Sequence, residues 1–557
     1  MAMGHTLSRC RRLYGQKCWP STSDFSGLES QLSQPLIHPL PTASPCYPVS
    51  SPSGNCTDVQ INGEKSSWRA DRPGSLDMAN FETFIFKNGS ISACYLNTSL
   101  GPCEQGNVPV VGIDARSVGD VQAAVKFAAT HNLRLAIKNT GHDYMGRSAA
   151  RGAFMIWTHH LQNITYNSTF VPQGAPTSET YDGITLGAGV SWNDAYDTVQ
   201  KHGRVLVGGL SADGTVGAAG GWLLGGGHGI ISPQYGLGVD NVIEINVVAA
   251  DGQYLTVNSH QHSDLFWALR GGGGGTFGVV TSVTYRTHPS TILTIVSYNS
   301  SSSNPDTMRK IFKEFIRIHP ALSDAGFSGY GSISNNSLHG LFALSNSSIA
   351  KTNQSLNSFF EYAQNLTSKE GPNLTTTTFF TFDSFYSFYD DLFASAKDVE
   401  GAYIEIGSRL VPRKSFENDY ERLADLFFDL GANWNYVAGG AVSKVAPDST
   451  GLNPAWRGCL WEATFGIAWD EGAPFSEIKR LRAELAATLK KVSDIMPGAG
   501  SYLNEGSAFE VDPMQTYFGS HYDRLKAIKD TYDPTGLFIV TSGVGSEDWD
   551  DDLNCRR

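Results

Sequence analysis

Three glycine-rich segments contain the residues whose types and spacing could carry chemistry. The first runs from Gly141 to Ser148 around His142, the second covers residues 208–229, and the third is Gly271–Gly275. Glycine lets the backbone approach a ligand closely, so that bare N–H groups can line a pyrophosphate. The segments therefore predict a site for a phosphate-containing cofactor, with tight turns in a β-rich domain as the competing interpretation.

The spacing of these glycines excludes the commoner phosphate-binding motifs. No G-x-x-x-x-G-K-[ST] pattern occurs, so the chain has no P-loop motif. The glycine runs also do not open a helix within a βαβ unit that has an acid about 20 residues further on, which argues against a Rossmann site.

His142 is the histidine with the strongest claim to a chemical role. Neutral imidazole is nucleophilic near pH 7 and can add to an electrophilic group. Asp143 beside it either orients the imidazole or is an ordinary turn residue. His159 and His160 are expected to be structural, whereas His228 lies in the second glycine segment and can contact a cofactor.

The elements that must position these segments are strands and helices that begin near residue 108. Ser117-Val-Gly-Asp120 is a capping-box pattern that predicts the start of a helix. The apolar run 133–138 predicts a strand that ends at the histidine loop, and Val242–Val248 predicts a strand that returns through a hairpin at Asp251-Gly252.

Beyond residue 290 the pattern changes to strands alternating with amphipathic helices, which predicts a second α+β unit. The expected strands are 291–298, 327–333 and 460–467, and the expected helices are 306–318, 352–366, 414–430 and 475–493, followed by a C-terminal helix at 522–532.

The chain length, the net charge and the distribution of apolar residues restrict the class of protein. A chain of 557 residues is longer than one core usually supports, so several domains are expected. A net charge of −13 argues against nucleic acid as a partner. No run of about 18 apolar residues occurs, so no membrane span is expected.

The cysteines favour an oxidising compartment. Six of the eight lie in the first 103 residues and none forms a C-x-x-C pair, which argues against zinc and for disulfides. Several N-x-S/T sequons agree with this interpretation. The N-terminus lacks the apolar stretch of a signal peptide, so either the signal has been removed or replaced or the chain stays inside the cell. We favour the first and expect a secreted protein.

Taken together, the motifs resemble the p-cresol methylhydroxylase or vanillyl-alcohol oxidase type of FAD-linked oxidoreductase, in the branch of berberine bridge enzyme and fungal oxidases. The resemblance begins with the G-H-x-x-x-G-x-S loop at His142. The further motifs are Gly238-Val-Asp-Asn241, Asp264-Leu-Phe-Trp267, Thr276-Phe-Gly-Val-Val280, Asn453-Pro-Ala-Trp-Arg457, Tyr502-Leu-Asn504, Tyr517-Phe-Gly519, Arg524–Lys529, Tyr532-Asp-Pro534 and Val544–Trp549. In order, they cover most of the chain.

The resemblance implies an α+β fold in which a two-subdomain FAD-binding domain joins an α+β substrate domain with an antiparallel sheet. We expect a disulfide-tied N-terminal extension at 1–104, the FAD-binding domain at 105–290, the substrate domain at 291–499, and a berberine-bridge-like segment at 500–557 that returns to the FAD domain.

The resemblance also implies that FAD is bonded through its 8α-methyl group to His142. The expected cofactor-binding residues are Asn139, Thr140, Gly141, His142, Asp143, Gly146, Arg147, Ser148, Asp213, Thr215, Val216, Gly220, Gly221, Gly278, Val280, Tyr502 and Asn504, and no metal is expected.

Two departures from the family pattern matter. Many relatives form a second flavin bond from the cysteine of a C-P-T-V-G segment, but this chain has Asp213-Gly-Thr-Val-Gly217, so one covalent link is implied. The catalytic glutamate of the plant members falls at Lys444 after Gly439-Gly440, so their acid–base mechanism does not carry over directly.

The resemblance implies an oxidase that acts on a small alcohol, phenol, sugar or secondary-metabolite intermediate, with molecular oxygen as second substrate and H₂O₂ as product. Tyr502 is the candidate catalytic partner of the flavin ring, or else an aromatic packed between domains. The alternative is an isomerase or cyclase that uses acid catalysis, with FAD mainly structural and Glu547 as proton donor.

Overall fold

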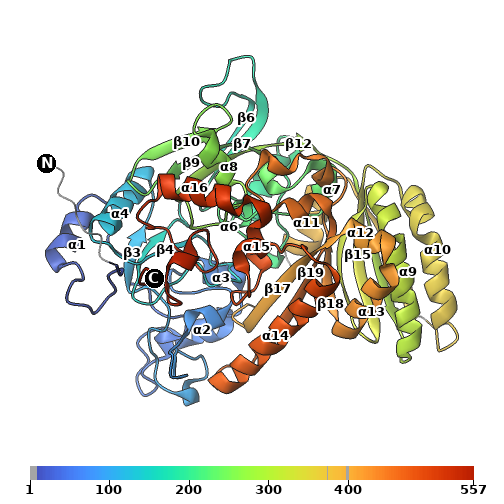
Figure 1. Ribbon diagram of the computed structural model, residues 1–557, viewed down its shortest axis with the longest axis horizontal. Helices are drawn as coiled ribbons and strands as arrows, with labels where there is room; N and C mark the ends of the chain where they lie inside the picture. Colours follow the sequence, from blue (N-terminus) through green and yellow to red (C-terminus); the bar gives the residue numbers. More distant parts are fainter. Residues whose placement is uncertain (1–8, 373, 395, 397–399) are drawn as a thin grey trace.

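The computed structural model describes residues 9–372, 374–394, 396 and 400–557, and within these residues it leaves out the side chain of Asp213. Figure 1 shows an elongated molecule with the start of the N-terminal arm at one side, helices α9 and α10 at the other, and α6, within the second glycine segment, near the middle. Three larger sheets form its framework.

A parallel sheet of three strands carries the histidine loop. Its order is β3–β5–β4, with the strands β3 (Val111–Asp114), β5 (Phe154–Trp157) and β4 (Leu135–Lys138). Helix α4 (Val118–Thr130) links β3 to β4. Ser117 and Asp120 form the predicted capping box at its start, which confirms that prediction.

An antiparallel sheet of five strands lies next in the chain, in the order β10–β9–β11–β7–β6. The strands are β10 (Tyr254–Asn258), β9 (Val242–Val248), β11 (Val279–Arg286), β7 (Tyr181–Gly187) and β6 (Ile164–Phe170). The predicted hairpin is confirmed, because β9 pairs with β10 and Gly252 adopts a φ of 78° between them. That φ lies in the left-handed region, which glycine enters without a steric penalty.

An antiparallel sheet of seven strands dominates the second half of the chain, in the order β16–β13–β15–β14–β18–β19–β17. The strands are β16 (Thr375–Phe382), β13 (Leu293–Ser301), β15 (Ser337–Ser345), β14 (Ser328–Ile333), β18 (Ala432–Tyr436), β19 (Cys459–Trp469) and β17 (Tyr403–Pro412).

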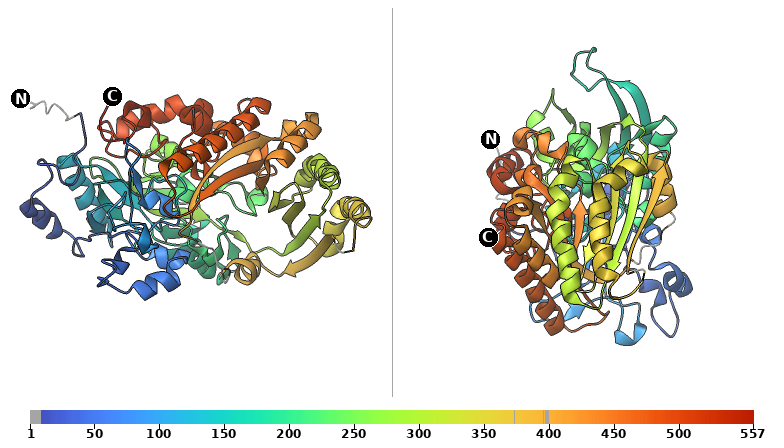
Figure 2. Two further views of the ribbon diagram at one scale, coloured as in Figure 1. Left: turned by 90° about the horizontal axis from the view of Figure 1, so that it is seen from below. Right: turned by 90° about the vertical axis from the view of Figure 1, so that its right-hand side faces the viewer.

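Four helices cover one face of the seven-stranded sheet (Figure 2). They are α9 (Pro305–Asp324), α10 (Ile349–Thr367), α13 (Tyr420–Leu430) and α14 (Phe475–Ile495). Leu293 and Ile295 on the opposite face join the core of the five-stranded sheet, so the two sheets meet there. The prediction of a single helix at 414–430 is wrong. The structure has two helices there, α12 (Arg413–Asn418) and α13, and Asp419 between them has a φ of −150°, which is not helical.

The remaining elements are short. They are α1 (Thr22–Glu29), α2 (Cys56–Asn62), α3 (Ser66–Ala70), β1 (Phe84–Ile85), β2 (Ile91–Ser92), α5 (Trp192–Gln200), β8 (Arg204–Val205), α6 (Gly221–Leu224), α7 (Ser232–Tyr235), α8 (Ser263–Leu269), β12 (His288–Pro289), α11 (Phe385–Tyr389), α15 (Pro513–Phe518) and α16 (Tyr522–Tyr532). Helix α16 has the predicted bounds. Among the described residues no helix is long and apolar enough to cross a membrane.

Disulfides tie the N-terminal arm at three places. Cys46 pairs with Cys56 and Cys94 pairs with Cys103, so the arm contains two internal disulfides, as expected for a disulfide-tied extension. Cys10 instead pairs with Cys555, which joins the two ends of the chain. Three disulfides indicate a protein of the secretory pathway, because such bonds persist in oxidising compartments.

Candidate functional site

A cavity of about 530 Å³ lies where the glycine segments meet the seven-stranded sheet. All three segments contribute to its wall, through the histidine loop, residues 209–224 and residues 274–280. Strands β14, β18 and β19 close the opposite side with Tyr330, Asn435 and neighbouring side chains. The volume is in the usual range for a bound small molecule.

His142 lies on the wall of this cavity, in the part called the first end below. It lies four residues after the last residue of β4, Lys138, and its Nδ1 lies 2.8 Å from Oδ2 of Asp77. The imidazole is 17% exposed, whereas the carboxylate is 1% exposed. The backbone N–H of Asp77 also donates to the carbonyl of Gly141 at 3.0 Å. The N-terminal arm thus supplies the carboxylate that holds the imidazole.

The loop that follows His142 is braced from within by Asp143. Its carboxylate accepts the backbone N–H of Met145 at 2.9 Å and that of Ser148 at 2.6 Å. Of the two roles considered for Asp143, the structure shows the turn residue. The carboxylate on the imidazole belongs to Asp77, 65 residues earlier in the chain.

Several polar side-chain atoms along the cavity are buried without a hydrogen-bond partner among the described residues. They are Oδ1 and Nδ2 of Asn139, Nη1 of Arg147, Oγ of Ser211 and Nδ1 of His228. Such atoms are rare in folded proteins because burial without a partner costs about 1–3 kcal/mol each. Their clustering in one cavity indicates a polar ligand that satisfies them.

Glycine is required where side chains from other segments approach the cavity wall. A Cβ on Gly217 would lie 2.1 Å from Nδ2 of Asn139, and one on Gly225 would lie 2.5 Å from Oδ1 of Asn504. Any larger residue would displace these two amides, which both line the cavity. The second glycine segment therefore positions amides as well as exposing backbone.

Tyr502 and Asn504 line the cavity as predicted. Nδ2 of Asn504 donates to the Tyr502 hydroxyl at 2.7 Å and to the Gly221 carbonyl at 2.8 Å, while its Oδ1 accepts from Arg147 at 2.8 Å. The Tyr502 hydroxyl donates to the carbonyl of Trp222 at 3.3 Å. Burial raises the pKa of Tyr502 well above its usual value, so this phenol stays neutral.

A second polar group on the cavity wall, called the second or other end below, is a histidine between two glutamates. Nε2 of His228 lies 3.2 Å from Oε1 of Glu505 and 3.4 Å from Oε2 of Glu462. Asn435 donates to both carboxylates, at 3.3 Å to Glu462 and 3.4 Å to Glu505. Glu462 is fully buried, whereas Glu505 is 25% exposed and lines the cavity.

Burial and mutual charge shift the pKa values of this cluster. Burial alone would lower the pKa of His228, but the hydrogen bonds and charges of the two glutamates outweigh it and raise the pKa to about 10. Burial and the charge of Glu505 raise the pKa of Glu462 to about 6, against the lowering effect of His228. His228 is therefore a cation at neutral pH, held by acids.

Four of the predicted site residues do not form part of the described cavity wall. Gly146 faces a second cavity, and the hydroxyl of Thr215 is buried against that of Ser66. The Asp213 side chain lies outside the described part of the structure. Glu547 is exposed, is hydrogen-bonded to Tyr522 and does not line this cavity.

The other fourteen predicted cofactor-binding residues line the cavity, so the structure brings nearly all of them together. Sequence reasoning missed Asp77, Glu462 and Glu505. Lys444, where the glutamate of the plant members was expected to fall, is exposed and off the cavity wall. Glu505 directly follows the recognised Tyr502–Asn504 motif, which was the available signal.

Both histidine clusters have a geometry that could also hold a metal ion. In the group of Asp77, His142 and Glu400 and in that of His228, Glu462 and Glu505, the candidate ligand atoms lie within 4.8 Å of one another. The expectation of no metal therefore stays a prediction.

The fold and the cavity define a flavoenzyme of the FAD-linked oxidoreductase class. A family model for the FAD-binding domain matches residues 109–258, and one described as berberine and berberine like matches residues 501–545. The glycine cradle and the unsatisfied polar atoms fit this cofactor, because a dinucleotide offers both phosphate oxygens and ring heteroatoms.

The chain belongs to the vanillyl-alcohol oxidase type of FAD-linked oxidoreductases, the berberine-bridge-like branch included, as its relatives show. It is 36% identical to an FAD-linked oxidoreductase of Arthroderma benhamiae, with 98% of this chain and 96% of the relative covered. It is 33% identical to the VAO-type flavoprotein oxidase of Thermothelomyces thermophilus, with 98% and 95% covered.

Solved structures agree with this assignment. A VAO-type flavoprotein of Myceliophthora thermophila superposes with a TM-score of 0.86 at 31% identity, covering 98% of this chain and 100% of the other. The glucooligosaccharide oxidase of Acremonium strictum has a TM-score of 0.64 at 21% identity over 78% and 91%, and shows the fold alone. The predicted fold class is confirmed.

Proposed function

We propose that this protein is a secreted oxidase that holds FAD covalently through His142 and oxidises the hydroxyl of a small alcohol, phenol, sugar or secondary-metabolite intermediate. One observation carries the proposal: a single cavity joins a carboxylate-held imidazole at one end to an acid–histidine cluster at the other. The first end suits attachment of the cofactor, and the second suits removal of a substrate proton.

At the first end, Asp77 positions the imidazole for attachment. A carboxylate 2.8 Å from Nδ1 fixes the ring and stabilises the positive charge that develops when an imidazole nitrogen is alkylated. The chain has Asp213 where a second, cysteinyl bond would form, which supports one link. The glucooligosaccharide oxidase is described as carrying a 6-S-cysteinyl, 8α-N1-histidyl FAD.

At the second end, Glu505 is the base that takes the hydroxyl proton. It lines the cavity wall together with His228, whose Nε2 lies 3.2 Å from its Oε1, while the buried Glu462 lies 3.4 Å from the same nitrogen. Tyr502 does not serve as base, because its hydroxyl is buried, neutral and already engaged with Trp222. It positions Asn504 instead.

The overall reaction balances with oxygen as the acceptor. The substrate carbon loses a hydride and its hydroxyl loses a proton to Glu505, so an alcohol becomes a carbonyl compound. FAD held in this cavity would supply the two-electron acceptor for that hydride, and O₂ would be the final acceptor, reduced to H₂O₂. The Thermothelomyces relative is named an oxidase, which supports oxygen as the acceptor.

The experiment has two parts. Acid-precipitated protein should keep its yellow colour in the pellet, and mass spectrometry should place the flavin on the peptide that contains His142. Anaerobic mixing with alcohol and sugar substrates should bleach the visible flavin band, and admission of air should restore it with formation of H₂O₂. A colourless pellet would refute the covalent link, and turnover without bleaching would favour the isomerase or cyclase.

A further inference from the structure

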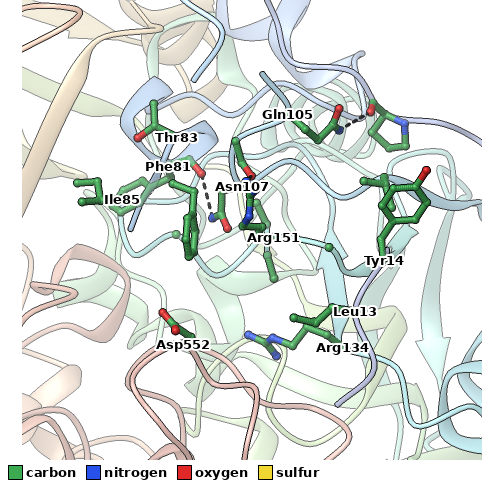
Figure 3. Close-up of a pocket in the computed structure, with 18 of the residues that line it drawn as sticks. Leu13, Tyr14, Phe81, Thr83, Ile85, Gln105, Asn107, Arg134, Arg151 and Asp552 are labelled. Carbon is green, nitrogen blue, oxygen red and sulfur yellow. Dashed lines mark hydrogen bonds between the residues drawn. The ribbon is translucent and has the colours of Figure 1, made fainter. Parts of the chain in front are cut away.

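A second, larger cavity lies behind the histidine loop. Its volume is about 1640 Å³, and it shares only Arg147 with the first cavity among the described residues. Its walls come from the N-terminal arm, the β1–β2 hairpin, residues 145–152 and the C-terminal residues 551–554. Figure 3 shows Phe81 and Ile85 on one side of the hollow and Tyr14 on the other. Nothing in the proposed oxidation uses this space.

Exposed apolar side chains gather around this cavity. Tyr14 is 61% exposed, Leu40 62%, Phe86 36% and Phe509 50%, and all four line it. They come from the arm, the hairpin and the segment after α14, which are far apart in the chain. Contiguous exposed apolar surface on a soluble protein marks a site for an apolar partner or ligand.

Two arginines inside the cavity form no ion pair among the described residues. Arg134 is only 7% exposed, its guanidinium donates to the Ile539 carbonyl at 2.5 Å, and the charge of Asp550 acts on it from beyond ion-pair distance. Arg151 donates to the Gly106 carbonyl at 2.9 Å and lies 4.9 Å from the ring centre of Phe86. It likewise forms no ion pair in the described structure.

An unpaired buried guanidinium is costly, because an ion loses its hydration without gaining a counter-charge. Burial lowers the pKa of Arg134 to about 10, which still leaves it charged at neutral pH. Arginine recognises carboxylates through paired N–H donors, so a bound carboxylate would compensate this cost. Figure 3 shows Arg134 and Arg151 around the same hollow.

We propose that this second cavity binds an amphipathic monocarboxylate, with its anionic head at Arg134 and Arg151 and its apolar body along the aromatic walls. The charge complementarity of the two arginines identifies the head, and the exposed apolar side chains identify the body. Three exposed acids, Glu29, Asp551 and Asp552, also line the cavity, and they disfavour a second negative charge on the ligand. The volume exceeds that of ordinary ligand sites, which leaves room for a long chain.

The test is calorimetric titration of the flavin-loaded protein with decanoate and, separately, with methyl decanoate, which has the same chain without the charge. We expect saturable binding of decanoate and at least roughly tenfold weaker binding of the ester, equal to about 1.4 kcal/mol. Arg134→Gln and Arg151→Gln should each weaken decanoate binding about tenfold while leaving the ester unaffected. Arg309→Gln, on the distant helix α9, is the matched control and should change neither.

Each outcome decides the matter. No saturable binding, equal binding of acid and ester, or decanoate binding that survives both substitutions would overturn the proposal. Arg134 is buried, so Arg134→Gln can disturb folding. Arg151 is only partly buried, and Arg151→Gln removes a cation from the cavity with less effect on folding. Neither arginine lines the first cavity, so failure here leaves the proposed oxidase function intact.

Discussion

The two ends of the first cavity use the same pair of residue types for different purposes. At one end the buried carboxylate of Asp77 holds His142, with the buried Glu400 close by, and of these three only His142 lines the cavity. At the other end Glu462 and Glu505 hold His228, and both His228 and Glu505 line the cavity. The first end thus offers a ligand an imidazole alone, and the second offers it an imidazole and an acid.

The difference follows from which acids line the cavity. Asp77 and Glu400 lie off the cavity wall, so at the first end the ring is the group that can reach a ligand. Two carboxylates around an imidazole keep it protonated, as its raised pKa shows, so that it stabilises the acid in front of it. The geometry predicts an attachment residue at one end and a proton acceptor at the other.

The largest effect should come from Glu505→Gln. Removing the proton acceptor should lower kcat by roughly 10²–10⁴-fold, the usual contribution of a general base. The covalent flavin should remain, because this residue lies at the other end of the cavity. Steady-state oxygen uptake and the colour of acid-precipitated protein measure the two effects separately.

Glu477→Gln in the first turn of α14 is the matched control and should leave both unchanged. Dialysis against EDTA should also leave turnover unchanged if the cluster works without a metal. Full activity of Glu505→Gln would contradict the assignment of the base, and loss of activity with EDTA would reassign the cluster as a metal site.

The next effect in size concerns His142→Ala. The flavin should leave with the supernatant on acid precipitation, and kcat should fall on the order of tenfold, about 1.4 kcal/mol in the barrier, because an unalkylated flavin is a weaker oxidant. His160→Ala, whose imidazole contacts Asp114 outside the cavity, serves as control. Flavin that stays bound to the His142→Ala polypeptide would show that attachment uses another residue.

The sequence could identify the first end of the cavity but only part of the second. His142 lies in a local motif, and the loop, its glycines and Asn504 all belong to contiguous segments that a pattern can reveal. Glu462, by contrast, is a single acid in an apolar strand, and its partner His228 is 234 residues earlier. The pairing of β19 with β18, which sets Glu462 opposite Asn435, places that acid beside His228.

Asp77 and Cys555 were out of reach of sequence reasoning for the same reason. Each acts on a residue in a distant segment, and no local pattern marks a long-range contact. The prediction of one helix at 414–430 was wrong for a different reason. The amphipathic periodicity continues through Asp419, but the backbone leaves the helical conformation at that residue. Periodicity reports which face is buried and does not report where a turn interrupts it.

A smaller effect is expected on the pH dependence. Glu462 has a raised pKa of about 6, so the cluster gains its full negative charge only above that pH, and kcat/KM should rise with pH through about 6. His228 lowers this pKa, so His228→Gln should move the rising limb to higher pH, by about one unit. His160→Gln should leave the limb in place. A limb at the same pH in His228→Gln would show that the cluster does not control proton transfer.

The smallest effect is expected from Asp77→Asn, which tests whether Asp77 assists the attachment of flavin to His142 or also takes part in the oxidation. Asp77→Asn keeps the shape and a hydrogen-bond acceptor near His142 but removes the charge that stabilises an alkylated imidazole. Attachment should become slow rather than impossible, so freshly purified protein should carry less covalent flavin than wild type and gain more on incubation with FAD. Asp71→Asn is the matched control, since Asp71 contacts His159 at the same 2.8 Å but away from the cavity. Once attachment is complete, the variant should turn over at nearly the wild-type rate, because Asp77 acts on the flavin only through His142. A persistent loss of kcat in fully attached protein would instead show that this carboxylate takes part in the oxidation.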